Sequence, residues 1–251
     1  MKRGLHGLIL LSFILFGIYY GQTMNKPKNT YVFIHGMTGG GWDWKHIDKL
    51  LSADGHHVYR PTLTGLGERM HLSDFDIDLT THILDIVNLI LFEQLENIIL
   101  VGHSYGGMVT TGVMNKVPDK IKHVFFLDAT VPEHNMSATD AHQYYANFVT
   151  KNGMAYPPWL ERGNEFPRDL PHPVKTLTEK VAFDNPSAKK LPVTYVKFVA
   201  DDHADVEKAS NSSWQRAVQR GWEIRTLDSD HNAQRSDPEA LKNILISLKR
   251  P

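Results

Sequence analysis

The chain contains no cysteine among its 251 residues, and its formal net charge at pH 7 is only -1. The lack of cysteine excludes disulfides, thiolate metal sites, cysteine nucleophiles and lipid attachment through an N-terminal cysteine. No cluster of Lys and Arg interleaved with aromatic residues is present, which argues against a nucleic-acid partner. The composition, 41% hydrophobic and 22% charged, is typical of one globular domain with a large core.

The N-terminus carries an apolar stretch, from Leu8 to Tyr20, which follows the basic residues Lys2 and Arg3. This stretch is shorter than the roughly 20 residues that a membrane-spanning helix needs. Residues 1–22 therefore predict a signal peptide, and export to the periplasm or the medium. Because residues 19–22 lack a small-x-small cleavage pattern, an uncleaved N-terminal anchor that tethers the protein to a membrane is the alternative.

From Thr30 onward, short β-branched or aromatic runs alternate with amphipathic stretches. This alternation predicts an α/β domain over residues 28–251, with a mostly parallel, doubly wound sheet covered by helices on both faces. The expected strands are 30–35, 57–60, 97–101, 123–128, 193–199 and 222–227. The expected helices are 44–53, 78–92, 108–117 and 238–248.

Residues 132–190 interrupt this alternation, because they contain no convincing strand and are rich in proline and aromatic residues. A segment of this length is too long for a simple loop in a compact domain. We therefore expect a mostly helical cap that lies over the carboxyl edge of the sheet. Its aromatic side chains either pack the cap onto the body or line a substrate pocket; they are Tyr144, Tyr145, Phe148, Tyr156, Trp159 and Phe166.

Residues 102–106, Gly-His-Ser-Tyr-Gly, join the apolar run 97–101 to a helix-compatible segment. A serine at the tip of a tight strand-to-helix turn needs glycine on both sides, because the backbone is strained and the helix passes close to the strand. The same turn aims the first amides of the helix at a developing oxyanion. Ser104 is therefore the predicted nucleophile of a nucleophile elbow, and His103 should point away from the reacting centre as a packing or hydrogen-bonding residue.

A serine hydroxyl requires a base, and the base requires an orienting acid. His231 follows the last expected strand and precedes the last helix, so it should emerge at the carboxyl edge near Ser104. Asp202 is the preferred acid, since it follows the strand 193–199 and gives the chain order serine, acid, histidine. Asp128, at the end of the strand 123–128, is the alternative.

Two further carboxylates, Asp201 and Asp205, are weaker possibilities for the acid, because each could simply cap the helix that follows. Backbone amides are the expected oxyanion donors, from Tyr105 directly after the serine and from Met37 in the loop after the first strand. The glycine-rich residues 36–41 lack the Gly-Lys-Ser/Thr ending of a phosphate loop, so no nucleotide is expected there.

Five segments together resemble the α/β-hydrolase superfamily, and within it the bacterial esterases related to plant hydroxynitrile lyases and methyl-ester-cleaving esterases. They are 33–36 (Phe-Ile-His-Gly), 41–44 (Gly-Trp-Asp-Trp), 61–69 (Pro-Thr-Leu-Thr-Gly-Leu-Gly-Glu-Arg), 101–107 (Val-Gly-His-Ser-Tyr-Gly-Gly) and 126–132 (Phe-Leu-Asp-Ala-Thr-Val-Pro). The lyases of this group carry a threonine and a lysine where this chain has Gly36 and Asn232. Without that lysine a cationic partner for departing cyanide is missing, so lyase activity is not expected.

The residues and the resemblance together predict a serine carboxylesterase that hydrolyses small or medium carboxylic esters through an acyl-enzyme, with no metal or organic cofactor. Its expected partner is a small-molecule ester, and a homodimer is left open. Two alternatives remain, since a fold and a triad do not determine the bond attacked. One is the same triad acting on a lactone, an amide or a carbon–carbon bond; the other is a non-catalytic ligand-binding protein.

Overall fold

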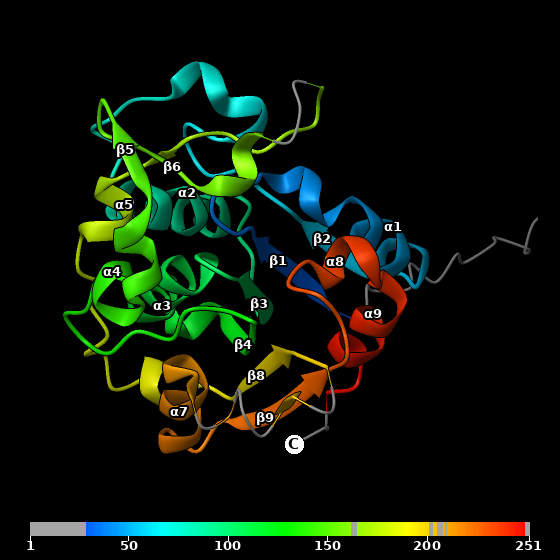
Figure 1. Ribbon diagram of the computed structural model, residues 1–251. Helices are drawn as coiled ribbons and strands as arrows, with labels where there is room; N and C mark the ends of the chain where they lie inside the picture. The colour runs from blue at the N-terminus through cyan, green and yellow to red at the C-terminus, as the bar shows by residue number, and fades with distance from the viewer. Residues whose placement is uncertain (1–28, 162–164, 201–202, 205–207, 209, 249–251) are drawn as a thin grey trace, which may run out of the picture.

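The core of the molecule is a six-stranded sheet in which all neighbouring strands are parallel, in the order β2-β1-β3-β4-β8-β9 (Figure 1). All six strands lie where the sequence predicts them, with ends that differ by one or two residues. Their bounds are β1 Thr30–Ile34, β2 His57–Tyr59, β3 Ile98–His103, β4 Ile121–Leu127, β8 Val193–Phe198 and β9 Glu223–Leu227.

This architecture comes from a computed structural model that describes residues 29–161, 165–200, 203–204, 208 and 210–248. The predicted signal peptide or anchor, residues 1–22, lies outside the described residues. Within the described ranges, no helix has both the length and the apolar character needed to cross a membrane.

Helices cover both faces of the sheet, as the alternating pattern predicts (Figure 1). Strand β1 shows why two layers form: Val32 and Ile34 pack into the core on one face, whereas Tyr31 and Phe33 pack into the core on the other. The first face carries α2 Leu79–Phe92, α3 Gly106–Lys116 and α7 Ser212–Gln219. The second carries α1 Lys45–Ala53, α8 Ala233–Ser236 and α9 Pro238–Ile246.

The segment between β4 and β8 corrects the expectation of a strandless, mostly helical cap. Its α-helices, α4 Ala138–Ala141 and α5 Lys175–Thr178, have only four residues each. A three-stranded antiparallel sheet is present instead, formed by β5 Val149–Lys151, β6 Met154–Tyr156 and β7 His172–Pro173.

The β5–β6 hairpin has a local cause that the sequence contains. Asn152 and Gly153 connect the two strands, with φ of 50° and 72°. An Asn-Gly pair favours the left-handed backbone of a two-residue hairpin turn, so this dipeptide was the signal for the missed strands.

Short 3-10 helices of three to six residues are also present among the described residues. They are η1 Gly41–Trp44, η2 Gly67–Leu72, η3 Pro118–Lys120, η4 Gln143–Asn147, η5 Pro158–Glu161 and η6 Ala188–Lys190.

Candidate active site

Ser104, the predicted nucleophile, lies between the end of β3 and the start of α3 and has a φ of 54°. This left-handed conformation is strained for a residue with a side chain, and such strain concentrates at functional sites. A Cβ on Gly102 would lie 2.1 Å from Thr110 Oγ1, and one on Gly106 would lie 2.8 Å from the carbonyl oxygen of His35. Glycine at both positions therefore lets α3 approach the sheet closely enough to form the elbow.

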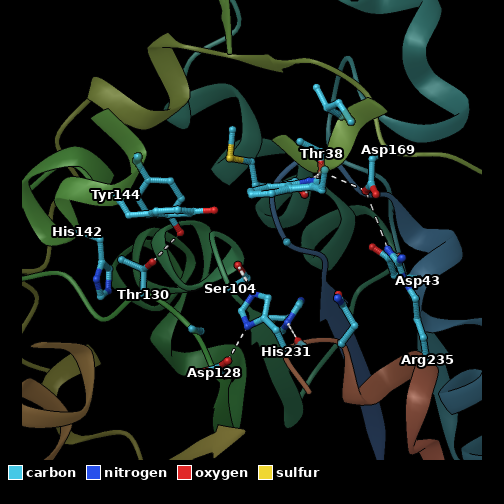
Figure 2. A pocket seen from close by; sticks show the side chains of 18 of the residues that line it. Thr38, Asp43, Ser104, Asp128, Thr130, His142, Tyr144, Asp169, His231 and Arg235 are labelled. Carbon is cyan, nitrogen blue, oxygen red and sulfur yellow. Dashed lines mark hydrogen bonds and ion pairs between the residues drawn. The ribbon is translucent and has the colours of Figure 1, made fainter. Parts of the chain in front are cut away.

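His231 reaches this serine from the loop between β9 and α8 (Figure 2). Its Nε2 atom lies 3.0 Å from Ser104 Oγ, and its Nδ1 atom lies 2.5 Å from Asp128 Oδ2. Because an ionised carboxylate only accepts, Nδ1 carries the hydrogen and Nε2 is left to accept from the serine hydroxyl. The imidazole therefore has the tautomer and the orientation that a general base needs.

Among the described residues, the carboxylate that contacts His231 is Asp128, the alternative of the sequence-based prediction. The preferred Asp202, and Asp201 and Asp205, lie outside the described residues. Asp128 reaches the histidine because β4 is the direct neighbour of β3, with Leu127 paired to His103, so the residues that follow each strand lie side by side. The hydrogen bond of His231 Nδ1 therefore goes to Asp128, and the preference for Asp202 stays a prediction.

Asp128 is buried, with 8% of its side chain exposed, and has a second partner. Lys197 Nζ donates to its Oδ1 atom at 2.6 Å. Burial alone would raise the pKa of Asp128, but the hydrogen bond and charge of His231, followed by the charge and hydrogen bond of Lys197, outweigh burial and hold that pKa below its usual value. Asp128 is thus a carboxylate at neutral pH, able to stabilise a protonated imidazole.

His103 lies behind the site rather than in the reacting line, as the sequence predicts. It packs against Trp44 and Phe198, and its Nε2 atom is 2.7 Å from the carbonyl oxygen of His231. Burial, followed by the charge of His231, lowers the pKa of His103 to about 3. The neutral ring therefore donates its Nε2 hydrogen to that carbonyl and ties the histidine loop to the elbow.

The predicted oxyanion donors come from two loops that meet at the serine. Tyr105 follows Ser104 at the N-terminus of α3, and Met37 lies in the loop after β1. A Cβ on Gly36 would lie 3.1 Å from Ser104 Cβ, so this loop passes directly beside the serine. Within the described part of the chain, neither backbone amide donates a hydrogen bond to a protein acceptor, so both N–H groups are available to a ligand.

The family model described as "Alpha/beta hydrolase family" matches residues 31–243. The chain belongs to this family. The carbendazim hydrolyzing esterase of Nocardioides sp. (strain SG-4G) is 48% identical to it over 107 residues, which span 43% of this chain and 44% of that protein. Methylesterase 2 of Arabidopsis thaliana is 31% identical over 139 residues, or 51% of this chain and 49% of that protein.

The matched regions thus span about half the length of these curated relatives, at 44% and 49%. Among solved structures, an extracellular alpha/beta-hydrolase from a Paenibacillus species superposes with a TM-score of 0.73 at 21% identity, covering 89% of this chain and all of that one. At this identity the likeness shows the fold alone. The α/β-hydrolase fold and the family resemblance predicted from the sequence are therefore confirmed.

In this alpha/beta hydrolase the serine opens into a cavity of about 1320 Å³. One wall is aromatic and comes from the cap: Tyr144 and Trp159 stack with ring centroids 6.4 Å apart, and Tyr145 meets Thr130 Oγ1 through its hydroxyl at 3.1 Å. Of the six cap aromatics, Tyr144, Tyr145, Trp159 and Phe166 line the cavity; Phe148 is buried, and Tyr156 is exposed.

The opposite wall is ionic, and sequence reasoning missed it (Figure 2). Arg235, from α8, donates through Nε to Asp43 Oδ1 at 2.8 Å, and its guanidinium lies 4.3 Å from the centre of the Trp42 ring. Burial raises the pKa of Asp43 to about 6, against the opposing charge of Arg235. Residues 41–44 signalled only a family resemblance, and no local pattern links them to Arg235, which is 192 positions away from Asp43.

The cap and the body meet at Thr38, which follows Met37. Trp159 Nε1 donates to Thr38 Oγ1 at 3.0 Å, and Thr38 Oγ1 donates to Asp169 Oδ1 at 3.0 Å. The Thr38 amide donates to Nδ1 of His172 in β7 at 3.3 Å. The cap therefore holds the loop that carries the Met37 amide. Among the described residues, no group of histidine and carboxylate side chains is arranged to hold a metal ion.

Proposed function

We propose that this protein is a serine esterase that hydrolyses small or medium carboxylic esters through an acyl-enzyme, with Ser104, His231 and Asp128 as its catalytic triad. The observation that carries the proposal is a pair of consecutive hydrogen bonds that faces one large cavity. They join Ser104 Oγ to His231 Nε2 at 3.0 Å and His231 Nδ1 to Asp128 Oδ2 at 2.5 Å. The esterases among its relatives support the same reaction class.

In the first half of the reaction, Ser104 Oγ attacks the ester carbonyl carbon while His231 Nε2 takes the hydroxyl proton. Asp128 stabilises the imidazolium that forms. The carbonyl oxygen becomes an oxyanion, and the amides of Met37 and Tyr105 donate hydrogen bonds to it. Donors that are already aimed need no reorganisation during the reaction, so they stabilise the transition state more than the bound ester.

In the second half, the tetrahedral intermediate collapses. His231 returns its proton to the leaving oxygen, and the alcohol departs. A water molecule then gives a proton to His231 and attacks the acyl carbon, and the acid product leaves as Ser104 regains its hydrogen. Each proton moves between one nitrogen and an oxygen, so the cycle needs no metal or organic cofactor.

The two walls of the cavity favour substrates of limited size. The aromatic side chains of Tyr144 and Trp159 offer flat, apolar surface to an acyl or aryl group, whereas the ionic wall around Arg235 disfavours a long alkyl chain. We therefore expect the highest kcat/KM with short acyl or aromatic esters, and a decline as the acyl chain lengthens.

The test is hydrolysis of p-nitrophenyl acetate, butyrate and longer esters by the full chain and by Ser104→Ala. We expect turnover to fall by about 10⁴-fold or more in the variant, with circular dichroism unchanged. Near-full ester turnover in pure Ser104→Ala would contradict the assignment. If the wild type hydrolyses a lactone or an amide better than every ester, the triad stands and the substrate class changes.

A further inference from the structure

Strand β8 ends with a lysine in an unusual place. Lys197 is only 9% exposed and lies between Val196 and Phe198, both of which pack into the core under α1 and α9. Because side chains alternate along a strand, Lys197 points to the opposite face, where it lines the cavity. A buried ammonium group is costly unless a charged partner compensates it. The buried position of Lys197 therefore needs an explanation.

Among the described residues, a charged partner of Lys197 is Asp128, the proposed triad acid. Lys197 Nζ donates to Oδ1 of this carboxylate at 2.6 Å, while His231 Nδ1 donates to Oδ2 at 2.5 Å. The lysine and the histidine thus bind different oxygens of one carboxylate. A carboxylate with both oxygens engaged cannot rotate about its Cβ–Cγ bond without breaking a charge-assisted hydrogen bond.

The main chain alone brings Asp128 and Lys197 next to each other. Strands β4 and β8 are parallel neighbours with Leu127 opposite Val196, so Asp128 and Lys197 are the next residues along. The Asp128 amide donates to the Val196 carbonyl oxygen at 2.7 Å, and Asp128 leaves the strand with a φ of 43°. The pair is therefore built into the sheet and does not depend on the cap.

We propose that Lys197 is a positioning residue of the triad: it fixes Oδ1 of Asp128 so that Oδ2 stays on His231, and it acts on the reaction through Asp128 rather than through the substrate. This inference rests on the proposed function and deepens it. Without Lys197, the buried carboxylate would have one anchored oxygen and would be free to turn away from the imidazole.

Among the described residues, the further titratable groups that face the pair are His103, His142 and Tyr145. Burial lowers the pKa of His103, at the end of β3, to about 3 and that of His142, in the cap, to about 4. Burial likewise raises the pKa of Tyr145. All three are therefore uncharged between about pH 5 and pH 9. They cannot replace the positive charge of Lys197 over the working pH range.

The first experiment compares Lys197→Met, which keeps the length of the side chain, with Lys197→Arg, which keeps the charge. We expect kcat for p-nitrophenyl butyrate to fall about tenfold to hundredfold in Lys197→Met with KM nearly unchanged, because the base is misoriented while the pocket is intact. Lys197→Arg should recover most of kcat. The control is Lys242→Met, which removes a lysine from another carboxylate pair, with Asp54 at 3.1 Å, and should leave kcat unchanged.

The pH profile separates this role from a packing role. Lys197→Met removes the positive charge beside the Asp128–His231 pair, so the acidic limb of kcat/KM should move in Lys197→Met and stay in place in Lys197→Arg. A loss of kcat with an unmoved acidic limb would make Lys197 a packing residue and overturn the proposal.

A double-mutant cycle tests whether Lys197 works through Asp128. In an Asp128→Asn background, Lys197→Met should change kcat by no more than about twofold, because no carboxylate remains to be positioned. Losses that multiply, or a KM that rises in both backgrounds and varies with the ester, would show direct contact with substrate and overturn the proposal.

Proton NMR follows the Asp128–His231 hydrogen bond without turnover. We expect a low-field Nδ1 proton signal in the wild type, which disappears in Asp128→Asn, weakens in Lys197→Met and returns in Lys197→Arg. If the NMR signal follows this pattern but ester turnover does not depend on Ser104, the positioning role of Lys197 is supported and the proposed function is contradicted. Ser104-dependent turnover with a Lys197→Met variant that matches the wild type in kcat, pH profile and signal would overturn the role of Lys197 alone.

Discussion

The body of this hydrolase and its cap hold their side chains in different ways. In the body, Ser104 and Asp128 directly follow neighbouring parallel strands, and both have positive φ, 54° and 43°. In the cap, Tyr144 and Trp159 stand on the single turns η4 and η5 and are held mainly by ring contacts. Ser104 and Asp128 are therefore positioned by the main chain, whereas the shape of the pocket depends on contacts between side chains.

This difference separates two kinds of mutational effect. A substitution at a strand end of the body removes a group of the proposed triad, so it should lower kcat for every ester. A substitution in the cap changes how the substrate is held, so its effect should appear in KM and should depend on the ester. The predictions below test this separation, beginning with the largest expected change.

Asp128→Asn should lower kcat by about 10³- to 10⁴-fold for all esters alike. An amide at this position donates to His231 as readily as it accepts, so the ring loses the tautomer that leaves Nε2 free to act as base. Steady-state kinetics on short and aromatic esters measures the effect, and Asp119→Asn, whose exposed side chain lies in η3 at the opposite end of β4, is the control. A loss of kcat that differs widely between esters would contradict the division between kcat effects of the body and KM effects of the cap.

Asp43 gives the ionic wall a pH dependence of its own. Its pKa is raised to about 6 in the folded protein from an ordinary value of 3.8. Between these values the folded state binds more protons than the unfolded state, so stability falls as pH rises from about 4 to 6, by about 2 to 3 kcal/mol for this group. Asp43→Asn should abolish that part of the decline.

Urea unfolding of the wild type and Asp43→Asn at several pH values between 4 and 7 measures this effect as a difference of unfolding free energies. A difference that stays constant with pH would mean that Arg235 keeps Asp43 ionised throughout, against the burial that raises its pKa.

Trp159→Ala should act on binding, with a rise in KM of about tenfold for aromatic esters and a smaller rise for acetate. Kinetics on matched aryl and acetyl esters measures it, with Trp159→Phe as the control that keeps an aromatic surface but loses the hydrogen bond to Thr38. A fall in kcat of the same size for all esters in Trp159→Ala would instead mean that the cap positions the loop that contains Met37. The division between kcat effects of the body and KM effects of the cap would then be wrong.

The same contrast explains what could be predicted from the sequence. The six strands and the elbow at Ser104 follow from local patterns, because apolar runs and glycine spacing record backbone geometry. The acid could not be chosen locally, since Asp128 and Asp202 both follow strands. The choice depends on the order of strands in the sheet, which places β4 directly beside β3. Sequence spacing carries no such information.

The cap was less predictable for two reasons. Its short strands lack the length that gives a clear alternating pattern, and the Asn152-Gly153 turn was the one local signal for them. The contacts that shape the pocket join distant positions, as when Arg235 meets Asp43 or Trp159 meets Thr38. Long-range pairs of this kind become visible only when the chain is folded.

The most direct test of the account is to find where an acyl group is carried during turnover. Wild-type protein would be mixed with p-nitrophenyl butyrate, quenched with acid within the first turnovers, digested and analysed by mass spectrometry. The account predicts one butyryl group on the peptide that contains Ser104, absent in Ser104→Ala. A butyryl group on another residue, or rapid ester hydrolysis with no acylated peptide under conditions that trap acyl-enzymes, would contradict it.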